Sequence, residues 1–261
     1  MPHQRLTIPA ELPEPENIDV KAILDGEYDA VCVLGPTASG KTRYAVELCR
    51  EMGRLGREAE ILSADSRQVY RGMDIGTGKD LCEYGEIPYH LIDIVPAGSK
   101  YNVYQYQKDF AEAYASVRSR GHIPVICGGS GLYIEAATRG YRFAKDQPQV
   151  LPEQLPQKTF YIGTLVSRDV RNARIDARLR TRLEEGLVDE IRRLLSEGIP
   201  ADDLIFYGLE YKFVTQYVLG ILTYEEMFAL LSNAIHQFAK RQMTWFRGME
   251  RDGVTIHWTE V

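Results

Sequence analysis

Short runs of apolar residues, bounded by glycine, proline or polar residues, recur along the first two thirds of the chain. They have the length of buried strands, and we predict strands over 29–35, 59–63, 89–95, 123–127 and 159–166. The runs are apolar throughout and do not alternate, which is typical of strands in a parallel sheet covered on both faces. We therefore expect a parallel sheet of about five strands.

Between and after these runs, apolar residues recur at the spacing of one helix face. We predict helices over 42–55, 103–120 and 132–138 between the strands, and over 170–185, 187–196, 206–219 and 224–247 beyond Ser167. Thr223 followed by Glu226 has the spacing of a capping box, which fixes the start of the last helix. Strands that alternate with helices predict an α/β fold, here followed by a helical C-terminal part.

Composition sets the domain organisation. The chain has 261 residues, of which 44% are hydrophobic and 26% charged, enough for one substantial core. Its apolar runs fall far short of the ~20 residues that cross a bilayer. Residues 1–17 are rich in proline and glutamate and lack the basic start and apolar stretch of a secretory signal. We expect a cytoplasmic protein without a membrane segment, with an extension of uncertain order over 1–27 and a folded core over 28–261.

Cysteine spacing and net charge exclude some kinds of site. The four cysteines are scattered and include no C-x-x-C pair, which argues against a zinc site and against a disulfide framework. The net charge is −6, from 31 basic and 37 acidic residues. A nucleic-acid partner would therefore need a local basic patch.

The segment that joins the first predicted strand to the first long helix has the pattern G-x-x-x-x-G-K-T. It consists of Gly35, Pro36, Thr37, Ala38, Ser39, Gly40, Lys41 and Thr42. In a P-loop, backbone N–H groups converge on phosphate oxygens at a helix N-terminus. Lys41 would neutralise phosphate charge and Thr42 would hold Mg²⁺. The pattern predicts an enzyme that binds a pyrophosphate or triphosphate on a P-loop NTPase-like parallel sheet with flanking helices.

Polar residues follow three other predicted strands, at the edge where parallel sheets bind ligands. Asp65 is a candidate base or metal ligand, although an aspartate after a strand is as often a helix N-cap. Ser130 follows Gly128 and Gly129, where many P-loop ATPases carry an acid; it either faces a substrate or caps the next helix. Asp93 is an alternative acid and leaves a kinase open, whereas we expect the nearby His90 to be structural.

One predicted helix is rich in arginine. Residues 168–182 contain six arginines and two aspartates, and spacings of three and four place Arg171, Arg174, Arg178 and Arg182 on one helix face. Such a face binds a pyrophosphate or an RNA backbone. A solvated helix face explains the pattern equally well.

Together these segments resemble the tRNA dimethylallyltransferases. The resemblance covers most of 29–141 and 167–248, and its motifs are the P-loop, 65–79, 90–93, 128–133 and 239–247. It implies transfer of a dimethylallyl group from its diphosphate to N6 of an adenine in tRNA, next to the anticodon, with Mg²⁺. It also implies that Asp65 is the general base, and that Ser130 contacts the substrate. The adenine is read by Asp65, Ser66, Arg67 and Gln68, and the pyrophosphate is bound by Arg174 or Arg178.

The chain departs from the family between Gly140 and Asp169, which are joined by a much shorter connection here. The helical insertion that clamps the anticodon stem-loop is absent, and 208–212 also differs from the family pattern. We predict a short, monomeric member with a weaker hold on the tRNA anticodon stem-loop. RNA would be held by the arginine helix with Lys240, Arg241 and Arg247, and the resemblance does not assign Arg182 to the active site. The alternatives are transfer to a free adenine nucleotide (AMP, ADP or ATP), a small-molecule kinase, or a non-catalytic RNA-binding relative.

Overall fold

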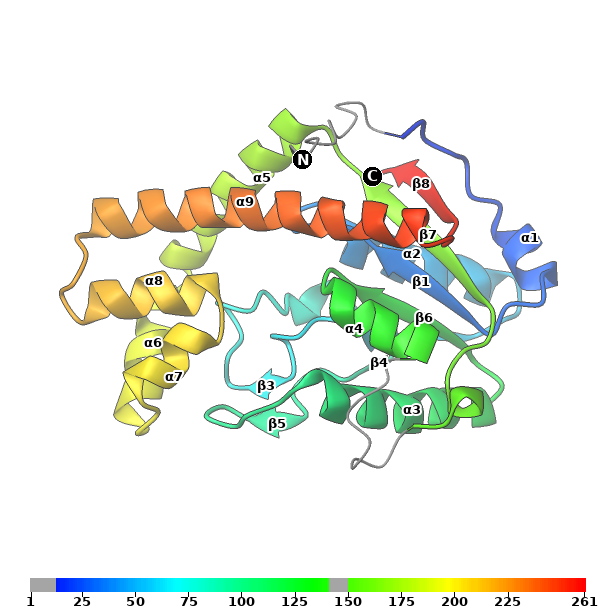
Figure 1. The fold of residues 1–261 in the computed structure, drawn as a ribbon, viewed down its shortest axis with the longest axis horizontal. Helices are drawn as coiled ribbons and strands as arrows, with labels where there is room; N and C mark the ends of the chain where they lie inside the picture. Colours follow the sequence, from blue (N-terminus) through cyan, green and yellow to red (C-terminus); the bar gives the residue numbers. More distant parts are fainter. Residues whose placement is uncertain (1–12, 141–149) are drawn as a thin grey trace, which may run out of the picture.

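A parallel sheet forms the centre of the computed structural model, which describes residues 13–140 and 150–261. In these residues the sheet has six strands in the order β4 (Tyr89–His90), β2 (Ala59–Ser63), β6 (Ile123–Gly128), β1 (Ala30–Leu34), β7 (Thr159–Leu165) and β8 (Ile256–Glu260). Every pairing between them is parallel. β3 (Tyr70–Arg71) and β5 (Val95–Pro96) form a separate small pair (Figure 1). The predicted α/β fold is confirmed.

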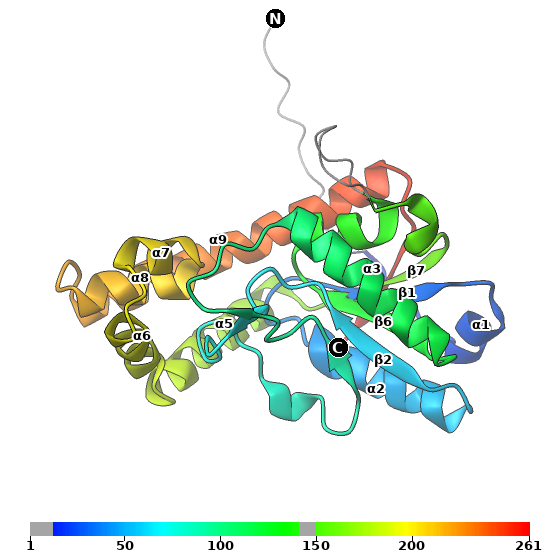
Figure 2. The same ribbon diagram turned by 90° about the horizontal axis from the view of Figure 1, so that it is seen from below.

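Helices cover both faces of this sheet (Figure 2). Side chains alternate along β1, which is buried at every position. Val31 and Val33 pack on the side of α1 (Val20–Asp25) and α2 (Lys41–Arg54). Cys32 and Leu34 pack on the side of α3 (Val103–Ser119), α4 (Gly131–Glu135) and the C-terminal half of α9 (Tyr224–Arg251). The strand that precedes the P-loop segment therefore lies in the middle of two cores.

The helical part has a core of its own. It consists of α5 (Arg168–Glu184), α6 (Leu187–Ser196), α7 (Ala201–Phe206), α8 (Leu209–Val218) and the first half of α9. α9 belongs to both parts: Leu231 and Ile235 pack in the helical core, whereas Phe246 and Met249 pack against the sheet. This long helix fixes the helical part beside the carboxyl edge of the sheet (Figure 1). Among the described residues, no helix combines the length and apolar character needed to cross a membrane.

The N-terminal boundary differs from the prediction. Within the expected extension over 1–27, residues 20–25 form α1, whose N-cap Asp19 accepts hydrogen bonds from the N–H groups of Lys21 and Ala22. Ile23 is buried in the same core as α2. The fold thus begins before residue 28. The sequence did not predict this helix, because six residues are too few to show a helical period. Residues 1–12 lie outside the described part of the chain.

Four further elements differ from the prediction. The strand expected over 89–95 ends at His90, because Leu91 and Asp93 have positive φ angles. The helix expected over 206–219 is two helices, α7 and α8, separated at Gly208. α4 ends at Glu135, and a π-helical turn follows over Ala136–Gly140. β8, which the sequence did not predict, pairs with β7 as an edge strand.

Candidate active site

The P-loop segment connects β1 to α2 and is packed closely against β7. A Cβ atom on Gly35 would lie 2.1 Å from Oγ1 of Thr164, so no larger residue fits there. The hydroxyls of Ser39 and Thr164 are 2.6 Å apart and buried. Ala38 and Gly40 adopt left-handed backbone angles, with φ of 59° and 83°. The segment therefore has the predicted position between a buried strand and a helix N-terminus.

A glutamine of α9 joins this segment to the glycine turn after β6. Oε1 of Gln242 accepts a hydrogen bond from the N–H of Thr37 at 2.8 Å, and its Nε2 donates to the carbonyl of Gly129 at 2.8 Å. A Cβ atom on Gly129 would lie 2.5 Å from that Nε2. One buried amide thus holds two loops at a fixed separation.

These loops form one end of a cavity of about 690 Å³ between the carboxyl ends of β1, β2 and β6 and the helical part. The cavity brings together most of the predicted site residues: Thr37, Lys41, Thr42, Asp65, Ser66, Arg67, Gln68, Ser130 and Arg178. Gly35, Pro36, Ala38, Ser39 and Gly40 shape the P-loop segment behind this lining. Arg174 is elsewhere: it is exposed, and its Nη2 donates to the carbonyl of Val261 at 3.5 Å.

Lys41 is the cation where the P-loop segment meets the cavity. Burial lowers the pKa of its amine from the ordinary value, and the nearby charge of Arg178 adds to this shift, whereas the negative charge of Asp65 opposes it. An anionic ligand beside the amine would reverse the shift, because it stabilises the charged form.

Asp65 and Ser130 lie at the ends of neighbouring strands. Oδ1 of Asp65 accepts a hydrogen bond from the N–H of Arg67 at 2.9 Å, so the carboxylate does cap the following turn. Ser130 occupies the N-cap position of α4, but its hydroxyl accepts from the N–H of Ser66 at 3.1 Å and caps nothing. Both side chains also line the cavity, so the two interpretations of Asp65 are compatible.

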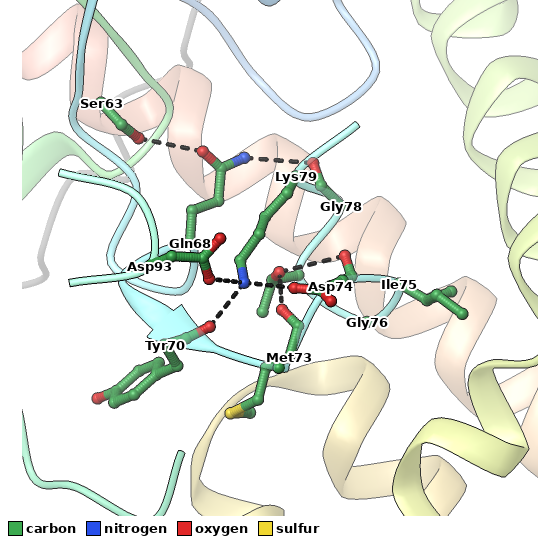
Figure 3. Close-up of polar contacts among 12 residues, drawn as sticks. Ser63, Gln68, Tyr70, Met73, Asp74, Ile75, Gly76, Gly78, Lys79 and Asp93 are labelled. Carbon is green, nitrogen blue, oxygen red and sulfur yellow. Dashed lines mark hydrogen bonds and ion pairs between the residues drawn. The ribbon is translucent and has the colours of Figure 1, made fainter. Parts of the chain in front are cut away.

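Gln68 is buried between the side chain of Ser63 and the backbone of Gly78. Its Oε1 accepts from the hydroxyl of Ser63 at 3.1 Å, and its Nε2 donates to the carbonyl of Gly78 at 3.2 Å (Figure 3). The loop that contains Gly78 is held from the other side by Glu190 of α6, whose carboxylate accepts hydrogen bonds from three successive N–H groups: Asp74, Ile75 and Gly76.

Lys79 forms a buried ionic cluster beneath this loop. Its side chain is 1% exposed, and Figure 3 shows its Nζ between Asp74, Asp93 and the carbonyl of Tyr70. The bonds to Asp74 and to the Tyr70 carbonyl are both 2.6 Å long. Asp93 is therefore paired and does not line the cavity, so it is not available as the acid of a kinase.

His90 is structural, as predicted. Its Nε2 lies 2.6 Å from the buried carboxylate of Glu60, which also binds His122 and Arg120. The hydrogen bond from Arg120, followed by those from the two histidines, lowers the pKa of Glu60 to about 2. This cluster involves β2 and β4 and contributes no residue to the cavity.

The face of α5 that carries the arginines is only partly solvated. Arg171 is buried, Arg178 and Arg182 are partly buried on the side of Ile175 and Leu179, and Arg174 is exposed. Arg182, which the resemblance does not assign to the active site, lines the cavity, and its Nη1 lies 3.7 Å from Oε1 of Glu210. Burial lowers the pKa of Arg182 and raises that of Glu210.

Further cavity residues had no predicted role, except Arg241, which was predicted to hold RNA. They come from α7, α8 and α9 and include Phe206, Lys212, Phe238, Arg241, Gln242 and Trp245. The last three belong to the segment 239–247, which carries part of the resemblance. Helical spacing shows that such residues share a face, but it does not show what lies opposite them.

The fold and this cavity define a class: an α/β protein with a P-loop-like fold and a cavity at the carboxyl edge of its parallel sheet. A family model described as "IPP transferase" matches residues 68–159 and 147–249. The chain belongs to this family.

Relatives agree with this assignment. The chain is 46% identical to tRNA dimethylallyltransferase 2 of Bacteroides fragilis, with 90% of this chain and 93% of the relative covered. It is also 46% identical to tRNA dimethylallyltransferase 1 of Porphyromonas gingivalis, with 88% and 93% covered. Among solved structures, the full-length tRNA isopentenylpyrophosphate transferase of Bacillus halodurans superposes with a TM-score of 0.77 at 28% identity, covering 88% of this chain and 89% of that one.

The comparisons also locate a difference in length. The alignment with the Bacteroides fragilis relative runs over 290 positions, more than the 261 residues of this chain, so that relative carries residues without a counterpart here. The two matched parts of the family model overlap at 147–159, inside the connection between Gly140 and Asp169. This overlap supports the prediction that the chain is a short member of the family.

Proposed function

We propose that the protein transfers a dimethylallyl group from dimethylallyl diphosphate to N6 of an adenosine in tRNA, next to the anticodon. The observation that carries this proposal is that one cavity joins the P-loop lysine Lys41 to the carboxylate of Asp65. The proposed phosphate site and the proposed base for the acceptor thus share one cavity. The names of relatives at 46% identity support the same reaction. A tRNA substrate would place the enzyme in the cytoplasm.

The diphosphate is proposed to lie on the P-loop segment, with Lys41, Arg178 and Arg182 around it. Mg²⁺ usually takes one or two protein ligands and completes its shell with phosphate oxygens and water. Thr42 offers one hydroxyl in the cavity, and the described residues contain no group of three acids, histidines or cysteines that could hold a metal alone. This donor set fits a Mg²⁺ shared with the diphosphate. The ion would neutralise charge that develops on the leaving group.

In the proposed reaction the bond between C1 of the allyl group and the diphosphate oxygen breaks, and a bond from N6 of adenine to C1 forms. The electrons of the broken C1–O bond leave with the diphosphate, whose charge Lys41 and the arginines stabilise. Asp65 accepts the proton that N6 loses. Ser130 holds the Ser66 N–H, and Gln68 is fixed to the Gly78 carbonyl, so the adenine-binding segment 65–68 is rigid before substrate binds.

The rim of the cavity favours RNA over a free nucleotide. Phe206, Phe238 and Trp245 line the cavity yet remain 79%, 38% and 43% exposed. Exposed aromatic rings are platforms on which unpaired bases stack. Lys212 and Arg241, exposed at the same rim, can meet phosphates. A mononucleotide would fill the interior and leave these residues unused.

Product analysis tests the proposal. The protein is incubated with labelled dimethylallyl diphosphate and, separately, bulk tRNA, AMP or ATP. We expect label in tRNA only, and none with Lys41→Ala, whose fold should persist because Lys41 faces ligand. Label in AMP or ATP alone would establish the free-nucleotide reaction instead. Transfer by Lys41→Ala at the normal rate would refute the phosphate site.

A salt titration tests the RNA surface. We expect weak binding of an anticodon stem-loop with a shallow slope, since each phosphate contact contributes about −0.9 to the logarithmic salt dependence. Arg241→Glu should weaken binding and flatten the slope. Arg192→Glu, a reversal on the exposed face of α6, is the matched control. Equal binding by both variants would mean that RNA is held by another surface.

A further inference from the structure

Asp80 places a carboxylate against two of the arginines that line the cavity. It forms an ion pair with Arg178, and its Oδ2 lies 3.8 Å from Nη2 of Arg182. The side chain of Arg182 is 11% exposed, compared with 36% for Arg178 and 39% for Asp80. Two cations that face a proposed diphosphate site are therefore already paired with an acid of the protein itself.

The backbone at Asp80 gives its side chain no other task. Asp80 has φ of 43°, in the left-handed region that disfavours residues with a Cβ atom. It occupies the N-cap of a short 3₁₀ helix, Leu81–Glu83, but its side chain makes no capping hydrogen bond. The described contacts of the carboxylate are those to the arginines.

The neighbouring glycine lets the loop approach the guanidinium groups. A Cβ atom on Gly78 would lie 1.7 Å from Nη2 of Arg182 and 2.8 Å from Nη2 of Arg178. The Gly78 carbonyl accepts from Arg178 at 3.4 Å as well as from Gln68. The loop is anchored up to Lys79 by its buried ionic cluster, whereas 80–83 are exposed. Asp80 can thus leave the arginines while the preceding loop stays in place.

We propose that Asp80 is an internal counter-ion of the diphosphate site, which the diphosphate of the substrate must displace from Arg178 and Arg182. This inference rests on the proposed function, because it assumes that these arginines receive the diphosphate. The counter-ion keeps both arginines extended toward the cavity when no ligand is bound. It also weakens the hold on the product, because the carboxylate competes for the same cations when pyrophosphate leaves.

Pyrophosphate binding with Mg²⁺ present, measured by titration calorimetry, tests the inference. Asp80→Asn keeps the shape of the side chain and removes its charge. We expect its Kd for pyrophosphate to fall about fivefold, the value of a partly exposed ion pair. Asp80→Gly, which adopts the left-handed backbone without strain, should show the same gain if the asparagine variant folds poorly. Asp189→Asn removes an exposed charge on α6 and should change nothing.

Two further measurements separate competition from a structural role. In an Arg178→Gln background the gain from Asp80→Asn should shrink, because one of the freed cations is gone. In the transfer assay Asp80→Asn should lower KM for dimethylallyl diphosphate and tighten inhibition by pyrophosphate by a similar factor. A change in kcat alone would contradict competition.

The outcomes distinguish this inference from the proposed function. If Lys41→Ala abolishes pyrophosphate binding but Asp80→Asn leaves it unchanged or weakens it, the counter-ion role of Asp80 is wrong and the proposed phosphate site stands. If the wild type does not bind pyrophosphate at all, the phosphate site fails and the counter-ion fails with it.

Discussion

Gln242 connects the two loops at the Lys41 end of the cavity, although it lies 205 positions along the chain from Thr37. Gln242→Met keeps the length of the side chain and removes both hydrogen bonds. Each buried backbone group left without a partner costs about 1–3 kcal/mol. Thr37 and Gly129 both line the cavity, but Thr37 is partly exposed whereas Gly129 is buried, so water can replace the bond to Thr37 in part. We expect the free energy of unfolding to fall by about 2–4 kcal/mol.

The same substitution should weaken pyrophosphate binding by about tenfold, because binding must then order a P-loop segment that Gln242 no longer holds. Urea unfolding, with and without pyrophosphate, measures both effects. Gln237→Met is the matched control: it makes the same change at an exposed position of α9 and should stay within about 0.5 kcal/mol of the wild type.

Gln242→Met with wild-type stability and wild-type pyrophosphate affinity would refute this reasoning. A loss of stability with unchanged affinity would show that Gln242 supports the fold but does not order the phosphate site.

Three other predictions follow from the site and its surroundings. Asp65→Asn should lower turnover by roughly 10²–10⁴. Its stability should be kept, because the amide oxygen can still cap the turn. A normal rate in single-turnover assays, with only the stability reduced, would contradict the role of Asp65 as the base. Lys79→Met should lower the free energy of unfolding in urea by about 1–3 kcal/mol, since the buried Tyr70 carbonyl loses its donor and the partly exposed carboxylates of Asp74 and Asp93 lose their cation. An unchanged free energy of unfolding would contradict it. Glu60 has a pKa lowered from 4.5 to about 2, so its contribution to the free energy of unfolding is present above pH 4.5 and is lost as pH falls toward 2. Arg120 is 41% exposed, so solvent screening limits the contribution of Glu60 to about 2–3 kcal/mol. Urea unfolding of Glu60→Gln between pH 4.5 and pH 2 should lack this loss of stability.

The sequence by itself determined the elements with strong local signals. The fully apolar run at β1, followed by the glycines and lysine of the P-loop segment, specified a buried strand, a tight turn and a helix, because each step depends on neighbouring residues. The capping box of Thr223 and Glu226 fixed the start of α9 for the same reason. The placement of Asp65 and Ser130 at one edge followed from the rule that parallel strands end together.

Only the tertiary structure decided which side chains meet. Nothing local to Arg182 shows that it faces a cavity, because helical spacing does not distinguish a face that packs on a loop from one that meets solvent. Asp93 was a candidate acid until the fold placed the buried Lys79 beside it. β8 is a five-residue edge strand whose pairing depends on β7, about ninety positions earlier. The hydrogen bonds and ion pairs that shape this site join segments far apart in the chain, so they exist only once the two cores have packed around α9.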